Sequence, residues 1–311
     1  MAQLYFSKFN INAQIYDVYD KPELEQVILN EVFERIDSNQ VHIGWYKNDD
    51  GEEMEYRYKF CDIIKDYDNR NIVGRLVKIY DGEAQSYDAE EDTVSTVWEE
   101  DRAASSTFCF DLVTEEIAFI TRQGLKYRQF NKYFKLLVEK YFPEDTFEIY
   151  LENNIGELKK KISRMTRILS IESIIVPPNA NESEYDVLFG ATKEEVRESG
   201  ATVYKQALEM QVKGGKSLKL NTGIIRRMFY AVSKGYGELV AKGRDHSNTN
   251  MTVTSYEDAP YTLPIPEKEK DALIAFRERA LHAITQLVLD KQQRTLEMAG
   301  DFDEEDKGDQ S

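Results

Sequence analysis

A change of hydrophobic period within residues 107–142, TFCFDLVTEEIAFITRQGLKYRQFNKYFKLLVEKYF, constrains the fold more than any other stretch of this chain. Apolar residues alternate with other residues in two short runs, 108–112 and 117–121, on either side of an acidic turn. This period of two predicts a β-hairpin. From Lys126 the spacing becomes helical, and Pro143 ends the helix because the residue before a proline disfavours the α conformation.

The helix predicted over 126–142 has a divided surface. One arc is apolar and carries Tyr127, Phe130, Phe134, Leu137, Val138 and Tyr141. The opposite arc is basic and carries Arg128, Lys132 and Lys135. We expect the apolar arc to pack on the sheet of the hairpin, which leaves the basic arc outside.

Other segments have the patterns of strands and helices on both sides of this unit. Strands are predicted at 3–16, 40–48, 54–67, 71–82, 146–151 and 170–176, and helices at 22–36 and 155–168. Residues 81–106 are acidic and poorly periodic, so we expect an exposed loop. The order of helix, strand, helix and strand after the hairpin favours a split β-α-β arrangement on a mixed sheet.

Residues 177–181, PPNAN, read as a linker between two regions. Beyond it we expect helices at 184–199 and 222–234, a strand pair at 235–244 and 251–255, and a long helix at 267–298. The predicted class is α+β, with a mixed sheet and packed helices followed by a second α+β region that ends in the long helix. The predicted domains are 1–176 and 182–298, followed by an acidic disordered tail at 299–311.

Composition narrows the protein class. The chain has 311 residues, of which 41% are hydrophobic, so it can form a proper core. No apolar run approaches the roughly 18–20 residues that cross a bilayer, so no membrane insertion is expected. The N-terminus lacks the plan of a secretory signal, and the two cysteines, Cys61 and Cys109, fit reduced thiols. These features predict a cytoplasmic protein. The three histidines are far apart in sequence, and we expect no metal, no cofactor and no catalytic cluster.

The charge is unevenly distributed. Residues 1–116 carry 27 acidic and 11 basic side chains, whereas residues 117–296 carry 23 acidic and 28 basic ones. The overall charge of −17 argues against non-specific coating of nucleic acid. It leaves room for a local basic surface, because fields decay within about 10 Å at ordinary salt.

Three cations repeat the basic arc on the helix predicted over 155–168. Lys160, Arg164 and Arg167 share the face opposite its apolar stripe, with no acidic residue between them on that face. The region 213–227 adds Lys213, Lys216, Lys219, Arg226 and Arg227. A phosphate backbone would turn the repulsion among such cations into a gain. The alternatives are a solubilising surface, or docking of these cations against the acidic first half of the chain.

The sequence resembles bacterial phage-defence proteins of the RexA/KwaB type and a related uncharacterised family. The likeness lies in the strand FCFD at 108–111, its partner IAFITRQG and the aromatic and basic helix that follows. It continues in IIRRMFYAVSKGYGELVAKGRD and in VTSYEDAP at 253–260, and it spans about 107–260. The resemblance implies DNA binding by a sensor or effector that has no classical active site.

Our first hypothesis is therefore a phage-defence component that binds nucleic acid, DNA rather than RNA, through backbone contacts of its basic faces. We also expect a homo-oligomer, and a partner protein of a defence operon. One alternative is a ribonuclease of the HEPN type, whose Arg-x4-His spacing occurs at Arg277 and His282. These two side chains lie about 140° apart on a helix and would converge only at a helix start or across a dimer. The other alternative is a protein–protein adaptor that uses the acidic half and tail.

Overall fold

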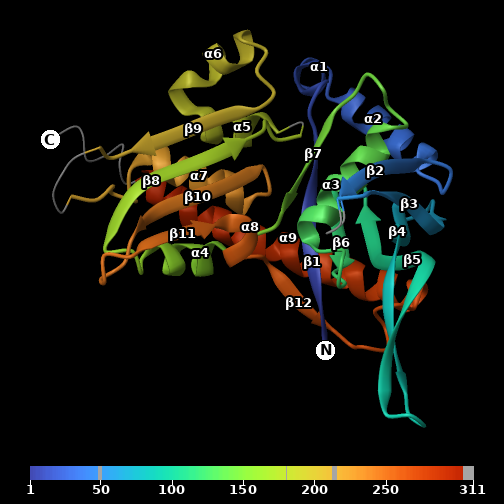
Figure 1. Cartoon of the computed structure of the whole chain (residues 1–311). Helices are drawn as coiled ribbons and strands as arrows, with labels where there is room; N and C mark the ends of the chain where they lie inside the picture. Colours follow the sequence, from blue (N-terminus) through green and yellow to red (C-terminus); the bar gives the residue numbers. More distant parts are fainter. Residues whose placement is uncertain (48–50, 180, 212–215, 304–311) are drawn as a thin grey trace, which may run out of the picture.

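Two antiparallel β-sheets lie side by side in the computed structural model (Figure 1). The model describes residues 1–47, 51–179, 181–211 and 216–303, with the side chains of 86–88 and 294–303 left outside that description. The predicted α+β class is confirmed. Every ladder between named strands in the described ranges is antiparallel, where the sequence suggested a mixed sheet.

The larger sheet contains eight strands. In spatial order they are β12 (Thr262–Ile265), β1 (Ala2–Ile11), β6 (Glu116–Ile120), β5 (Thr93–Asp111), β4 (Asn71–Asp88), β3 (Glu53–Asp66) and β2 (Val41–Lys47), while β7 (Phe147–Leu151) also pairs with β1. The helices α1 (Ile15–Asp20), α2 (Glu23–Arg35) and α3 (Tyr127–Glu139) follow or interrupt these strands. The long helix α9 (Leu273–Asp303) begins six residues later than the sequence suggested, and it extends into the tail that was predicted to be disordered. Residues 304–311 of that tail lie outside the described ranges.

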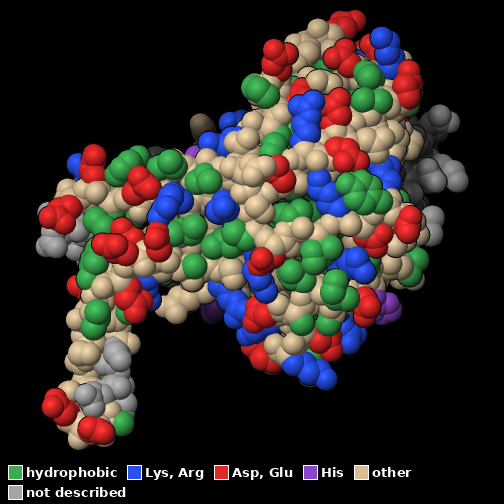
Figure 2. Space-filling view, turned by 90° about the vertical axis from the view of Figure 1, so that its right-hand side faces the viewer, with side chains coloured by type: hydrophobic (Ala, Val, Ile, Leu, Met, Phe, Trp, Pro, Cys, Tyr) green, Lys and Arg blue, Asp and Glu red, His purple; other side chains and the backbone are tan. Residues whose placement is uncertain are grey.

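The expected loop at 81–106 is a long β-ribbon, so that expectation was wrong. β4 and β5 stay paired from Asn71 opposite Asp111 to Asp88 opposite Thr93. The far part of the ribbon projects from the body and carries acidic side chains at its end (Figure 2). Both of its faces are open to solvent, as the half-exposed Val97 and Trp98 show. A ribbon without a buried face has no alternation of apolar and polar residues, which explains why the sequence pattern missed it.

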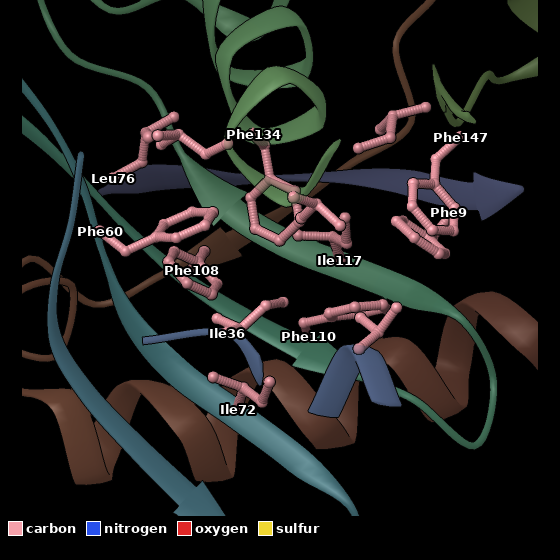
Figure 3. Close-up of a cluster of buried hydrophobic side chains, with 14 of the residues drawn as sticks. Phe9, Ile36, Phe60, Ile72, Leu76, Phe108, Phe110, Ile117, Phe134 and Phe147 are labelled. Atoms are coloured by element: carbon pink, nitrogen blue, oxygen red, sulfur yellow. The ribbon is translucent and has the colours of Figure 1, made fainter. Parts of the chain in front are cut away.

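The predicted hairpin of 107–121 and its helix are confirmed. β5 and β6 pair from Phe108 opposite Phe119 to Asp111 opposite Glu116. The apolar arc of α3 lies on this sheet, and the rings of Phe119 and Phe130 stack with their centroids 3.9 Å apart. Figure 3 shows Phe134 pointing from α3 toward the strands. Each buried phenylalanine contributes about 1.5–3 kcal/mol of transfer free energy, so this cluster is the main core of the larger sheet.

The other face of the larger sheet is covered by α9. The alternation along β5 sends Phe108 toward α2 and α3, and Cys109 toward α9. Phe276 and Ile284 of α9 are buried in this second cluster. The larger sheet is therefore a layer between α2 and α3 on one face and α9 on the other.

The smaller sheet has four strands. In spatial order they are β11 (Asn250–Thr254), β10 (Gly237–Arg244), β8 (Arg167–Ile175) and β9 (Tyr204–Glu209). Its helices are α4 (Ile155–Ile162), α5 (Glu182–Phe189), α6 (Lys193–Glu198), α7 (Gly223–Ser233) and α8 (Ser255–Asp258), together with the 3-10 turn η1 (Gly190–Thr192). Apolar residues of α4 and α7 share one core cluster with β8, β10 and β11. The predicted pairing of 235–244 with 251–255 is confirmed by β10 and β11.

The predicted domain boundary at residue 176 does not separate the two sheets, because each sheet contains strands from both sides of it. β8 precedes that point but pairs with β9 and β10 of the smaller sheet. β12 follows it but pairs with β1 of the larger sheet. Long-range pairing thus ties the two sheets together.

A buried cluster of charged groups joins the larger sheet, the segment between β7 and α4, and α9. The ammonium of Lys291 lies 2.7 Å from Glu116 Oε1 and 2.6 Å from Glu152 Oε1. Lys8 forms a neighbouring pair with Glu115 at 2.8 Å. Gly235 fits against this cluster with a φ of +77°, and an added Cβ would lie 2.1 Å from Glu152 Oε1. The packing therefore requires glycine at this position.

Both cysteines are free thiols. Cys109 is buried and Cys61 is half-buried. Within the described ranges, no helix is long and apolar enough to cross a membrane.

Candidate nucleic-acid interface

Cations gather where β8 and β10 end at one edge of the smaller sheet. Arg167 is the first residue of β8 and lies opposite Arg244, the last residue of β10. Arg164 is exposed in the turn between α4 and β8. Thr166 links the two strand ends, because its hydroxyl donates to the carbonyl oxygens of Arg244 at 3.2 Å and Asp245 at 2.9 Å.

This arrangement corrects the helix predicted over 155–168. α4 ends at Ile162, so Lys160 lies on the helix, whereas Arg164 and Arg167 do not. The buried Met165 extends the helical spacing, but it reaches the core from the turn. Pairing of β8 with strands on both sides then overrides the helical pattern.

The segment that follows residue 215 joins the same edge. Arg167 donates from Nε to the carbonyl of Lys216 at 2.9 Å. The hydroxyl of Ser217 accepts the backbone N–H of Ile168 at 2.9 Å, and Leu218 donates back to the carbonyl of Ile168 at 3.0 Å. These bonds hold residues 216–219 beside β8. We call the cations of this edge the basic end: Arg164, Arg167, Lys216, Lys219 and Arg244.

The carboxylate next to the basic end is turned toward its own loop. Asp245 accepts the backbone N–H groups of Ser247 at 2.8 Å and Thr249 at 2.9 Å. Arg244 donates from Nη1 to Asn248 Oδ1 at 2.9 Å, while its buried Nε has no hydrogen-bond partner among the described residues. Arg164, Lys216 and Lys219 are exposed. No carboxylate of the described residues forms an ion pair with Arg164, Lys216 or Lys219, so these three cations present positive charge at the basic end.

Lys160, the cation that lies on α4, is partly neutralised by a neighbouring carboxylate. Lys160 is 63% exposed and lies 3.3 Å from Glu157, three residues earlier. Such exposed pairs contribute about 0–1 kcal/mol, so Lys160 remains available to another anion.

The basic arc of α3 lies in a groove of about 270 Å³ between α3, β7 and α8. Arg128 stacks on Tyr256 with its guanidinium carbon 3.6 Å from the ring centroid, and it lies 4.0 Å from Glu257. Lys135 is half-buried and pairs with Glu148 at 2.6 Å. Lys132 is exposed.

The α3 groove also contains Glu238, whose pKa is raised by burial. Arg128 and Lys135 are thus matched by local acids. The ion pairs of Arg128 and Lys135 are made with Glu257, Glu139 and Glu148, all of which follow residue 116. The acidic first half does not provide these partners.

The two arginines of α7, Arg226 and Arg227, are half-buried. Arg227 lies against the α5 side, where an added Cβ at Gly190 would be 3.5 Å from its Nη1. Arg226 is held by contacts of its own. Lys213, the remaining predicted contact, lies outside the described residues.

The residues of the alternative ribonuclease hypothesis are not brought together in the chain. Arg277 is 24% exposed and lies 3.4 Å from Asp66 of β3. His282 faces a different hollow, which it shares with Glu278 and Arg279. Within the described ranges, no group of three or more His, Cys, Asp or Glu side chains could hold a metal ion.

Sequence reasoning also missed a second set of cations at the base of the projecting ribbon. Arg75, Lys78, Arg102 and Arg122 line a hollow of about 930 Å³ there. They come from β4, β5 and the turn after β6, so no local spacing in the sequence connects them. Only the presence of Arg75, Lys78 and Arg102 inside an otherwise acidic half could have pointed to this set.

The comparison with protein families gave one informative result. The model of a family described as "Domain of unknown function (DUF4747)" matches residues 3–282. A search of curated proteins gave no match. The family match spans both sheets and the first ten residues of α9.

Proposed function

The chain belongs to the DUF4747 family, and we propose that it binds the phosphate backbone of nucleic acid through the basic end. The observation that carries the proposal is the assembly of Arg164, Arg167, Lys216, Lys219 and Arg244 from three separate segments at one sheet edge. Cations held close together at a surface repel one another. A bound polyanion relieves this repulsion and gains affinity from phosphate contacts and from counterion release.

The form of binding follows from the geometry. Arginine side chains offer forked donors that match phosphate oxygens, and lysines add point charges. Among the described residues, the basic end consists of the ends of β8 and β10, the turn after α4 and the docked segment 216–219. We therefore expect backbone-directed, salt-dependent binding with little sequence preference. The expectation that DNA is bound more tightly than RNA rests on the resemblance to phage-defence proteins. This binding fits a sensor or effector of phage defence that performs no chemistry itself.

Fluorescence anisotropy with a short labelled duplex tests the proposal. The test variant carries Arg164→Gln, Lys216→Gln and Lys219→Gln, three exposed positions whose replacement should leave the fold intact. The control variant carries Lys21→Gln, Lys47→Gln and Lys268→Gln, which are exposed elsewhere and change the net charge equally. RNA of the same sequence is measured in parallel.

We expect the test variant to bind DNA at least about tenfold more weakly than the wild type at low salt, and the control variant to change little. Absence of DNA binding by the wild type at low salt would refute the proposal. Equal weakening in the two variants would also refute it, because the effect would then come from net charge alone. Self-association and a partner protein of the same operon stay predictions from the sequence.

A further inference from the structure

The hollow at the base of the ribbon forms where β6 leaves β5. β5 and β6 pair only from Phe108 to Asp111, whereas β5 continues toward the ribbon. Residues 102–105 of β5 therefore have β4 on one side and line the hollow. The turn that contains Arg122 and Gly124, and Asp271 before α9, supply the remaining walls. In Figure 1 the segment between β12 and α9 passes the base of this ribbon.

Three arginines of the hollow are held in place by the protein. Arg75 donates from Nη2 to the carbonyl of Asp271 at 3.0 Å, and Arg122 forms an ion pair with the carboxylate of the same residue. Arg102 donates to the carbonyl of Glu83 and lies 3.6 Å from Glu99. Each guanidinium has five N–H donors, so these bonds fix its position and leave donors for a ligand.

Lys78 is the cation without an acidic partner. Its ammonium lies 4.8 Å from the centroid of Tyr80 and 5.8 Å from that of Tyr56. No carboxylate of the described residues pairs with it, and burial lowers its pKa. The guanidinium carbon of Arg102 lies over the same Tyr80 ring, 5.7 Å from its centroid. The Tyr80 ring thus holds two cations beside one hollow.

The charges of the walls favour a compact polyanion. Four cations and two carboxylates, Glu83 and Asp271, line the hollow in a chain whose net charge is −17. Asp62 and Glu99 are not among the lining residues, but they form ion pairs with Arg75 and Arg102, which leaves Lys78 as the lining cation that no carboxylate of the described residues pairs with. A volume of about 930 Å³ exceeds what a single small ion needs. Forked guanidinium groups and an ammonium around one hollow are the donors that bind phosphate oxygens.

We infer that this hollow binds a small polyphosphate, free or as the phosphate chain of a nucleoside triphosphate, with Lys78 as the central contact. The site is separate from the basic end and would function whether or not that edge binds nucleic acid. Isothermal titration calorimetry with inorganic tripolyphosphate is the direct test, with ATP, AMP, adenosine and an oligoglutamate peptide as further probes.

Two variants test the site by different routes. Lys78→Met removes the charge and keeps the length of the side chain. Ala103→Glu places a carboxylate in the hollow from an exposed position, so it should fold even if replacement of Lys78 disturbs the ribbon. Lys47→Met, at an exposed position of β2, is the matched control.

We expect tripolyphosphate to bind at one site, with an affinity at least about tenfold weaker in Lys78→Met and in Ala103→Glu and unchanged in Lys47→Met. Tighter binding of ATP than of tripolyphosphate would identify the nucleotide as the source of the phosphate chain, and equal binding would identify free polyphosphate. DNA affinity should be unchanged in Lys78→Met, which separates this site from the basic end. No binding of tripolyphosphate, binding unaffected by both variants, or binding of the peptide alone would overturn the inference.

Discussion

Replacement of Lys291 by methionine should be among the most destabilising single changes in this chain. Its ammonium is shared by Glu116 and Glu152, whose side chains are only 2% and 1% exposed. It also donates to the carbonyl of Lys234 at 3.3 Å. Methionine would fill the space and leave two buried carboxylates close together without their hydrogen-bonded cation, with Lys8, which is paired with Glu115, as the remaining cation nearby.

The magnitude follows from this burial. Removal of one partner of a buried ion pair costs about 3–5 kcal/mol, because the remaining charge is left uncompensated. Burial, with a contribution from Glu116, already raises the pKa of Glu152 to about 7. Without Lys291 this pKa should rise further, so proton uptake by Glu152 relieves part of the cost at low pH. We therefore expect a loss of about 4 kcal/mol at pH 8 and a smaller loss at pH 6.

Urea unfolding followed by circular dichroism at both pH values measures this effect. Lys268→Met, an exposed lysine before α9, is the control and should change the free energy of unfolding by no more than about 0.5 kcal/mol. A loss below about 1 kcal/mol at pH 8 would show that the cluster is not the buried unit described here. A loss that grows at pH 6 would refute the protonation argument.

Three further predictions concern the charged cluster and α9. Glu152→Gln should flatten the pH dependence of stability: the folded state holds a proton on Glu152 up to about pH 7, so wild-type stability should fall as pH rises from 4.5 to 7. Glu152 should contribute up to about 3 kcal/mol to the fall in stability, which is measured from the urea midpoints of the wild type and of Glu152→Gln at pH 5 and 7.5. If the difference between the two pH values is the same in both proteins, the prediction is wrong. Gly235→Ala should lower the free energy of unfolding by more than about 1 kcal/mol, because its φ is +77° and the new Cβ would collide with Glu152; wild-type stability of this variant would contradict the packing. RNA incubated with the protein should stay intact on a gel, since Arg277 and His282 are held apart, and cleavage lost in His282→Ala would contradict this expectation.

The central hairpin and α3 could be predicted because their signals are local. Phe108 and Phe110 alternate toward a buried face, and the apolar arc of α3 covers that face. The same reasoning failed where both faces of a strand pair are exposed. Val94 and Trp98 lie in a ribbon that is open on both sides, so periodicity carries no information there.

The candidate interface could be predicted only in part. The sequence pointed to Arg164, Arg167 and Lys216, but it placed two of them on a helix that ends at Ile162. Their actual grouping depends on the ladder between β8 and β10, which adds Arg244 from a distant part of the chain. Such long-range pairings carry no local spacing, and the hollow around Lys78 was missed for the same reason.

The salt dependence of DNA binding tests the central claim most directly. If Arg164, Lys216 and Lys219 each contact one phosphate, their joint replacement by glutamine should reduce the slope of log affinity against log salt by about 2 to 3. The control variant with Lys21, Lys47 and Lys268 replaced should keep the wild-type slope. A wild-type slope in the first variant would show that the basic end does not meet the phosphate backbone.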